Sequence, residues 1–311
     1  MSHSPAKILI IRGGAVGDFI LTLPAIQLIK DQLPHLEIEV LGYPAIAELS
    51  VAAGLVDRVS SIEDGTLAHF FVPNAKLDDS VCHYLASFNV VVSYIYDPDD
   101  YFSENLLRAG VQTLLKGPYQ MSEDSPFVPA AKQLALPLEG LALYLDDAEL
   151  QKSFTSKPKI SNRIWIHPGS GSPKKNWSFE NWAAFMKRVQ STNPELQFCL
   201  SCGEAELERI GDLESLLKKE SIRYQLFSGL TLTELAEEIQ QAQIYIGHDS
   251  GISHLAALTG TSAILLFGPT NPDIWAPANS WTQIYRAPDY QLGSLSPDQL
   301  YDRFVELFTA Y

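Results

Sequence analysis

Short apolar runs alternate along this chain with amphipathic segments of helical spacing. The runs are near-continuous, as is typical of parallel strands that are buried on both faces of a sheet. We expect strands over residues 7–12, 37–41, 58–62, 90–94, 111–115, 164–166, 196–201, 244–246 and 263–267. We expect helices over residues 19–33, 45–53, 79–88, 102–109, 179–190, 207–219, 232–241 and from about 250 to 258. Repeated strand–helix units of this kind predict an α/β fold built on doubly wound parallel sheets.

The alternation loosens between residues 136 and 162, where prolines and lysines punctuate the chain. Similar α/β series lie on both sides of this segment, and 311 residues are enough for two domains of ordinary size. We therefore predict one Rossmann-like domain over residues 1–150 and a second over residues 151–311. Ser296-Pro297-Asp298 opens a last helix with proline at its first position, and we expect that this helix can pack back on the first domain.

Composition and charge exclude several classes of protein. Hydrophobic residues make up 46% of the chain and charged residues 19%, which is an ordinary globular mixture. The formal net charge of −15 argues against nucleic acid as a partner. No apolar run approaches the roughly 18 residues that a membrane-spanning helix needs, and residues 8–11 are too few for a signal peptide. We expect a soluble cytoplasmic protein with at most peripheral contact with the inner membrane.

The sequence gives little support for a metal centre. Cys199-x-x-Cys202 has no second cysteine pair and no histidine at zinc-site spacing, so we interpret these cysteines as structural. An acidic cluster, Asp97, Asp99 and Asp100, follows the strand expected over residues 90–94. It is either a metal-binding acidic motif or an acidic loop at the carboxyl edge of the sheet, and we favour the loop without metal.

A strand, a polar turn and a helix start follow one another between residues 244 and 258. Asp249 and Ser250 stand where helix N-caps belong, and Gly251 lets a ligand approach the backbone closely. A helix N-terminus favours phosphate, because its free N–H groups and its dipole both attract negative charge. His254 lies one turn further along the same helix face as Ser250. The alternative interpretation is an ordinary capped helix with a buried histidine.

A second loop of the same half has the composition of a phosphate site. Residues 167–177 follow an expected strand, are rich in glycine and serine, and end in two lysines. Gly169 and Ser170 supply N–H and hydroxyl donors, and Lys175 supplies a mobile positive charge. Both loops should lie at the carboxyl ends of parallel strands, where open α/β sheets bind ligands. Together they predict a diphosphate-bearing ligand rather than purely structural loops.

The first half offers a carboxylate instead. The turn after residue 12 reads Arg12-x-Gly14-x-x-Gly17-Asp18, which departs from the dinucleotide fingerprint because arginine replaces its first glycine. A carboxylate at the mouth of this turn would repel a pyrophosphate, whereas it suits proton abstraction. We predict that Asp18 is a general base. The alternative is that Asp18 only caps the following helix.

Four segments together resemble glycosyltransferase family 9, the heptosyltransferases of lipopolysaccharide core synthesis. They are Arg12-x-x-x-x-Gly17-Asp18…Thr22-Leu23-Pro24, His167-Pro168-Gly169-Ser170…Lys175-x-Trp177…Trp182, His248-Asp249-Ser250-Gly251-x-x-His254-Leu255-Ala256-Ala257 and Phe267-Gly268-Pro269-Thr270. The resemblance extends from about residue 7 to residue 277. It implies a GT-B fold, in which two Rossmann-like domains face a cleft and the C-terminal one binds the donor.

The resemblance also implies roles for individual residues. Asp18 becomes the catalytic base, and Gly14, Gly17 and Asp97 lie on the acceptor side. On the donor side, Lys175, Ser250 and Gly251 contact the diphosphate together with the Gly169–Ser170 loop, while Asp249 and His254 line the donor. Glu204 or Glu206 takes the nucleotide ribose.

The function implied is an inverting, metal-independent transfer of a sugar without any cofactor. The donor is a nucleotide sugar, with ADP-heptose as the expected one, and the acceptor is a glycan or glycolipid of lipopolysaccharide type or a related one. The first half has few basic residues for an anionic lipid, which leaves a less charged acceptor open. Three alternatives remain: a nucleotide-sugar-binding protein without transferase activity, a GT-B nucleotide-sugar epimerase, and a Rossmann dehydrogenase.

Overall fold

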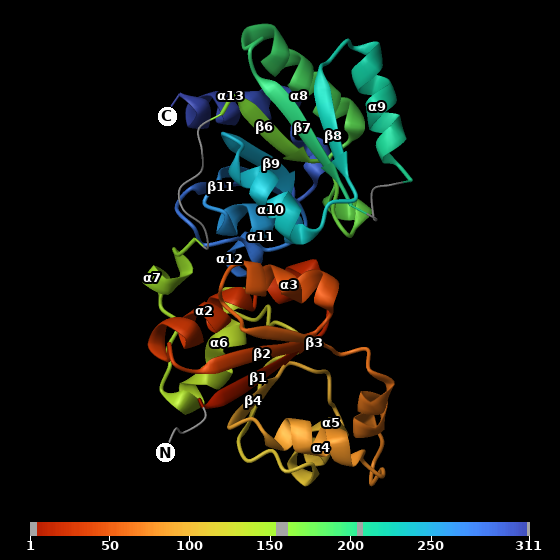
Figure 1. Ribbon diagram of the computed structural model, residues 1–311. Coiled ribbons are helices and arrows are strands. Elements are labelled where there is room, and N and C mark those ends of the chain that lie inside the picture. Colours follow the sequence, from red (N-terminus) through yellow and green to blue (C-terminus); the bar gives the residue numbers. More distant parts are fainter. Residues whose placement is uncertain (1–4, 154–160, 204–207, 310–311) are drawn as a thin grey trace. The chain divides into compact units, whose positions relative to one another are not determined.

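The computed structural model describes residues 5–153, 161–203 and 208–309, which form two compact units (Figure 1). The first unit is Met1–Leu150 and the second is Gln151–Tyr311. Each unit holds a parallel β-sheet, so the predicted α/β class is confirmed. Within the described segments, no helix combines the length and apolar character that crossing a bilayer requires.

The first unit is built on a five-stranded sheet in the order β3-β2-β1-β4-β5, with every pairing parallel. Its strands are β1 (Lys7–Arg12), β2 (Glu37–Gly42), β3 (Arg58–Ser61), β4 (Val90–Ser93) and β5 (Leu114–Lys116). Its helices are α1 (Val16–Ile20), α2 (Leu23–Gln32), α3 (Pro44–Ala52), α4 (Asp79–Ala86), α5 (Tyr101–Arg108), α6 (Ala130–Ala135) and α7 (Asp147–Leu150), with 3-10 helices η1 (Gly65–Phe71) and η2 (Leu136–Leu141).

The second unit is built on a six-stranded parallel sheet in the order β11-β10-β9-β6-β7-β8. Its strands are β6 (Arg163–His167), β7 (Gln197–Cys202), β8 (Tyr224–Ser228), β9 (Ile244–His248), β10 (Ser262–Phe267) and β11 (Thr282–Arg286). Its helices are α8 (Phe179–Thr192), α9 (Ile210–Lys219), α10 (Leu232–Gln240), α11 (Gly251–Leu258), α12 (Pro272–Trp275) and α13 (Pro297–Phe308), with 3-10 helices η3 (Pro173–Lys175) and η4 (Leu292–Ser294).

Each unit has its own hydrophobic core. In the second unit, alternate residues of the central strands pack with α8, α9 and α13, around buried residues such as Trp182 and Phe304. The terminal helix α13 thus packs on α8, where Phe185 and Phe304 meet edge to face with ring centroids 6.0 Å apart. In the first unit, a separate cluster gathers β1, β4, η1 and α5 around Phe70 and Phe102.

One long expected helix is two helices in the structure. The pattern over residues 19–33 predicts one helix in which Pro24 must fall in an early turn or bend the helix, and the chain breaks at Leu21–Thr22 between α1 and α2. Pro24 has no N–H for Ile20 and its ring would clash with that carbonyl, so a helix cannot run through it. The break leaves Pro24 in the first turn of α2, the place in which proline is tolerated.

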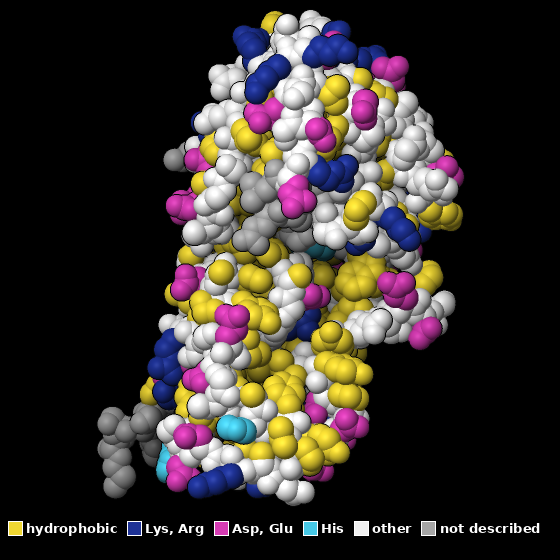
Figure 2. Space-filling model, turned by 90° about the vertical axis from the view of Figure 1, so that its right-hand side faces the viewer, with side chains coloured by type: hydrophobic (Ala, Val, Ile, Leu, Met, Phe, Trp, Pro, Cys, Tyr) yellow, Lys and Arg dark blue, Asp and Glu magenta, His cyan; other side chains and the backbone are white. Residues whose placement is uncertain are grey.

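The exposed large hydrophobic side chains are concentrated in the first unit. Among the described residues, every large hydrophobic side chain that is strongly exposed belongs to this unit, with the exception of Tyr290. On the face shown in Figure 2, hydrophobic side chains cover more of the first unit than of the second, and acidic and basic side chains lie on both units. Large exposed apolar patches on soluble proteins commonly mark binding surfaces.

Candidate active site

The two loops that the sequence analysis predicts to bind phosphate both lie at the carboxyl edge of the second sheet. Strands β6, β9 and β10 are adjacent and parallel, and they end at His167, His248 and Phe267. The chain segments that follow them therefore emerge at one edge. This is the edge at which open α/β sheets bind their ligands.

The Asp249 carboxylate joins three different loops, because Lys175 and Thr270 both donate hydrogen bonds to it. The Lys175 ammonium donates to Asp249 Oδ2 at 2.7 Å, and the Thr270 hydroxyl donates to the same oxygen at 2.7 Å. Asp249 is only 7% exposed, so its charge needs these partners. Asp249 thereby holds Lys175 at the sheet edge, a function that the sequence did not indicate. Thr270 was likewise missed as a site residue, although it lies in one of the quoted segments.

Helix α11 begins at the same edge. Ser250 is its N-cap, and the Ser250 hydroxyl accepts from the Ser253 N–H at 3.3 Å. The predicted cap is thus confirmed, and Gly251 occupies the first helical position. The N–H groups of the first turn point out of the helix start, and they can bind an anion beside Lys175.

His248 ties the glycine–serine loop to β9. Its Nε2 accepts the Trp177 N–H at 2.9 Å, and its Nδ1 lies 3.5 Å from the Gly169 carbonyl. These two contacts hold both ends of the loop that carries Ser170 and Lys175. Complete burial lowers the pKa of His248 to about 3, so the imidazole is neutral and can accept from Trp177. His248 lies in one of the quoted segments, but the sequence analysis assigned it no role.

Two further donor-side candidates, Ser170 and His254, belong to the segments at this edge. Ser170 is buried, and its hydroxyl lies 2.7 Å from Asn176 Oδ1 and 2.9 Å from the Ser172 carbonyl, so it shapes the loop. His254 is buried in α11, where burial lowers its pKa while the Asp249 charge opposes that shift. Glu204 and Glu206, the candidates for the ribose contact, lie outside the described residues.

The glycine turn of the first unit presents Asp18 to solvent. Asp18 lies in the first turn of α1, its Oδ2 accepts from the Ala15 N–H at 2.9 Å, and its side chain is 47% exposed. Gly14 has φ +99°, and a β-carbon there would lie 2.7 Å from Asp18 Oδ2, so only glycine allows this turn. Asp18 therefore caps its own helix with one oxygen and leaves the carboxylate accessible, so the two interpretations of the sequence are compatible.

Arg12, at the end of β1, stabilises this turn through contacts with Asp18. Its guanidinium is buried, donates to the Asp18 carbonyl at 3.2 and 3.3 Å, and lies 3.7 Å from Asp18 Oδ1. Burial lowers the pKa of Arg12, and the Asp18 charge opposes that shift. The residue that breaks the dinucleotide fingerprint thus holds the candidate base in place.

Gly17 and Asp97 are the other acceptor-side candidates, and both belong to the first unit. Gly17 is the second residue of α1. Asp97 accepts from the N–H groups of Phe102 and Ser103 at 3.0 and 2.8 Å, in the first turn of α5. Burial raises the pKa of Asp97, but the Ser103 and Phe102 hydrogen bonds outweigh it and the pKa lies below its ordinary value. Over the described parts of the chain, no group of three or more His, Cys, Asp or Glu residues could hold a metal ion.

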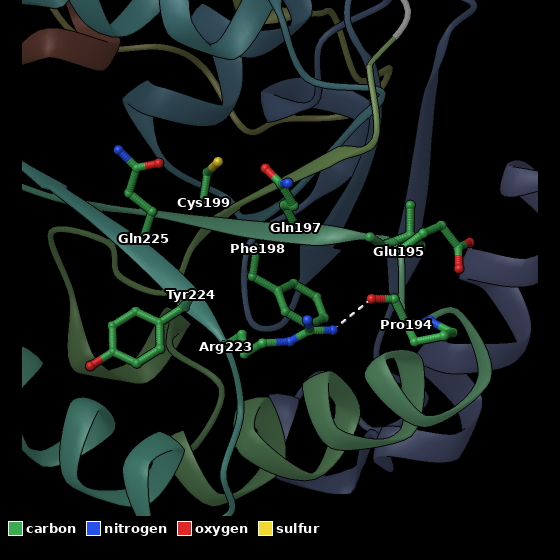
Figure 3. Close-up of a pocket in the computed structure, with 9 residues that line it drawn as sticks. Pro194, Glu195, Gln197, Phe198, Cys199, Arg223, Tyr224 and Gln225 are labelled. Carbon is green, nitrogen blue, oxygen red and sulfur yellow. Dashed lines mark hydrogen bonds between the residues drawn. The ribbon is translucent and has the colours of Figure 1, made fainter.

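One pocket of the second unit lies away from these loops (Figure 3). It has a volume of about 380 Å³ and lies where β7 and β8 begin, at the amino edge of the sheet. Arg223 bridges its wall by donating to the Pro194 carbonyl at 2.6 Å. Cys199 lines it from a buried position that raises the pKa of its thiol to about 11, which favours a structural thiol over a reactive one.

Solved structures share this architecture over nearly the whole chain. A family 9 glycosyltransferase from Veillonella parvula superposes with a TM-score of 0.76 at 16% identity, covering 100% of this chain and 99% of that one. A heptosyltransferase from Escherichia coli, solved with ADP, gives a TM-score of 0.72 at 17% identity, covering 97% and 99%. Together with the two parallel sheets, these matches define a GT-B glycosyltransferase fold.

Sequence comparison makes the assignment more specific. The chain belongs to glycosyltransferase family 9 (heptosyltransferase), whose sequence profile matches residues 122–299, more than half of the protein. The lipopolysaccharide core heptosyltransferase of Haemophilus influenzae is 23% identical over 296 residues, which covers 90% of this chain and 84% of that protein. The predicted family is confirmed, and the chain is a glycosyltransferase.

Proposed function

We propose that this enzyme transfers a heptosyl group from ADP-heptose to a hydroxyl of a lipopolysaccharide-type or related glycan acceptor. The observation that carries the proposal is the meeting of Lys175, the Asp249 carboxylate and the α11 N-terminus at one sheet edge. The names of its relatives support the sugar, and the related Escherichia coli structure solved with ADP supports the nucleotide.

In this proposal the second unit binds the donor. Lys175 and the first N–H groups of α11 contact the diphosphate, and the Gly169–Ser170 loop contacts it from the other side. Asp249 keeps Lys175 in position, and His254 lines the donor. The ribose contact is assigned to Glu204 or Glu206. As the sugar leaves, Lys175 and the helix start stabilise the charge that develops on ADP, without a metal ion.

The first unit binds the acceptor and supplies Asp18 as the base. Asp18 takes the proton of the acceptor hydroxyl while that oxygen forms a bond to the anomeric carbon from the face opposite the diphosphate. The bond from the anomeric carbon to the diphosphate breaks, ADP leaves, and the configuration inverts. The exposed carboxylate, held by the Ala15 N–H and Arg12, is suited to this role.

The experiment that tests the proposal measures donor binding and transfer separately. Thermal shift with ADP, GDP, UDP and CDP, with and without magnesium, should give stabilisation by ADP that does not depend on magnesium. A ligand at 100 times its Kd stabilises by about 2.7 kcal/mol, enough for a visible shift in Tm. Asp18→Asn should abolish transfer from ADP-heptose and leave the ADP shift unchanged. Transfer at the wild-type rate by Asp18→Asn would remove Asp18 from the base role.

A further inference from the structure

A groove opens at the carboxyl edge of the five-stranded sheet, within the first unit. Its volume is about 290 Å³. It is lined by residues that end or follow β2 and β3, by η1, and by the start of α5: Leu41, Ile62, Glu63, Asp64, Gly65, Leu67, Ala68, Phe71 and Phe102. None of these lining residues is a lysine, an arginine or a histidine.

The groove adjoins the turn that carries Asp18. A β-carbon placed on Gly13 would lie 4.0 Å from Cδ1 of Ile62, which lines the groove, and 3.9 Å from the ring of Tyr43. Gly13 directly precedes Gly14, whose backbone lies against the Asp18 carboxylate. A molecule in the groove therefore has the glycine turn beside it.

The aromatic wall of the groove is held firmly. Phe71 is 47% exposed, yet its ring stacks on the buried ring of Phe102 with a centroid distance of 4.7 Å. The buried amide of Asn105 donates to the carbonyls of Phe70 and Val72 at 2.9 and 3.0 Å, on both sides of Phe71. The Asp64 carboxylate caps the start of η1 through the Thr66 N–H. Phe71 is thus fixed in an exposed position, and an apolar ligand would remove its ring from water.

The chemistry of the lining selects the occupant. Six of the nine lining residues are apolar, namely Leu41, Ile62, Leu67, Ala68, Phe71 and Phe102, and none of these six side chains can pair with a sugar hydroxyl. A buried hydroxyl without a partner is costly, so a sugar ring is disfavoured against these six side chains, away from the carboxylates of Glu63 and Asp64. The carboxylates of Glu63 and Asp64 would repel a phosphate or a carboxylate at the groove. An uncharged hydrocarbon has no hydroxyl that needs a partner and no negative charge that these carboxylates would repel.

We propose that this groove binds a hydrocarbon segment of the acceptor, joined through an uncharged linkage to the unit that presents its hydroxyl to Asp18. The inference rests on the proposed function, because it assigns the groove to the acceptor of that reaction. The apolar surface of the first unit is consistent with it.

The test compares three probes below their micelle concentrations by isothermal titration: n-octyl β-D-glucoside, methyl β-D-glucoside and n-octyl phosphate. Octyl glucoside should bind at least tenfold more tightly than methyl glucoside, because each buried methylene adds affinity. Octyl phosphate should bind more weakly than octyl glucoside, and Glu63→Gln should narrow that difference. Equal binding of the two glucosides by the wild-type protein would overturn the proposal.

Two variants locate the binding. Ala68 is exposed at the groove, so Ala68→Trp should fill the groove without disturbing the core and should weaken octyl glucoside at least tenfold. Phe71→Ala, which removes the exposed wall, should weaken it as well. Leu136→Trp, a change at an exposed apolar residue of η2 outside the groove, is the matched control and should have no effect. Octyl glucoside binding that survives both groove variants would contradict the assignment.

The ADP thermal shift separates this inference from the proposed function. An ADP shift without octyl glucoside binding refutes the groove assignment and leaves the transferase proposal standing. Octyl glucoside binding without an ADP shift refutes the ADP-sugar donor and leaves the groove as a hydrocarbon site.

Discussion

At the scale of single residues, Asp249 is the centre of the proposed donor site. One of its carboxylate oxygens accepts hydrogen bonds from both the Lys175 ammonium and the Thr270 hydroxyl. A lysine has three donors, so Lys175 can keep Asp249 as a partner while it contacts a diphosphate oxygen. The carboxylate therefore limits where the lysine can lie without consuming its capacity to bind an anion.

Replacement of Lys175 should affect the transfer step more than folding. We expect Lys175→Ala to lower kcat by about 10²–10³, the cost typical of removing one donor to a developing negative charge. Lys174→Ala is the matched control, because Lys174 is the preceding lysine, is exposed, and should change kcat little. Steady-state kinetics with ADP-heptose measures both. Equal losses in the two variants would indicate a general charge effect instead of a specific contact.

His248 should make stability depend on pH. Its pKa is lowered to about 3 in the folded protein, against about 6.5 for a free histidine, so the unfolded chain binds more protons between these values. The contribution is fully present above about pH 6.5 and is lost as the pH falls towards 3. Urea unfolding between pH 7 and pH 4 should therefore show declining stability, with a shallower decline for His248→Gln. The exposed His35→Gln is the control and should keep the wild-type slope.

At the scale of elements, the short helix α11 connects stability with ligand binding. Ser250 caps it through the Ser253 N–H, and its remaining first-turn N–H groups are available to an anion. A cap fixes the direction of those groups as well as stabilising the helix. The two effects can be separated by comparison with another capped helix of the chain.

Ser250→Ala should lower stability by about 1 kcal/mol, as is usual for loss of an N-cap, and should also weaken ADP binding. Asp78→Ala is the matched control, because Asp78 caps α4 of the first unit through the Ser80 and Val81 N–H groups. It should lower stability comparably without changing the Kd for ADP. Unfolding curves and titration with ADP measure the two quantities. An unchanged Kd for Ser250→Ala would exclude the α11 start from the diphosphate site.

How far elements could be predicted depended on their burial. The strands β1, β4, β6, β9 and β10 are buried on both faces and appear in the sequence as apolar runs, so both sheets could be predicted. The strands β8 and β11 lie at the edges of the second sheet with half-exposed side chains, and their mixed composition gave no such signal. The capping box of α10 joins Thr231 and Glu234, which are only three positions apart, so a signal of this kind depends on local residues alone.

In the candidate site, local features could be predicted from the sequence, whereas contacts between distant residues could not. Glycine turns and helix starts are local, so Gly14 and Ser250 could be identified from spacing alone. The pairing of Thr270 with Asp249 and the contact of His248 with Trp177 join residues 21 and 71 positions apart. Such contacts follow from strand order, which spacing along the chain does not encode.

At the scale of the whole molecule, the two units have separate cores. The clusters around Phe102 and around Trp182 share no residue, and each surrounds its own parallel sheet. Each unit is also of the size of an independently folding domain. The second unit should therefore keep its fold and its donor site without the first.

A protein comprising residues 151–311 should fold and bind ADP with a Kd within about threefold of that of the full chain, but should not transfer heptose, because it lacks Asp18. Circular dichroism and ADP titration test this, with Lys175→Ala in the same fragment as the control for specific binding. A folded fragment without ADP affinity would assign part of the nucleotide site to the first unit.

The start of the second unit has a consequence for exchanging its parts. The Gln151 side chain accepts from the Ser280 N–H at 2.7 Å and donates to the Ala278 carbonyl at 2.5 Å. Its amide therefore forms one hydrogen bond as acceptor and one as donor with the backbone of residues 278–280, as a peptide group would. The Asn279 amide donates to the Lys152 carbonyl at 3.4 Å. A chimera joined after Leu150 keeps Gln151 and these hydrogen bonds within its second half. A chimera joined after Lys152 has a residue from the other protein at the position of Gln151. Recombination of first and second units between members of the family should therefore tolerate a junction after Leu150 better than a junction after Lys152.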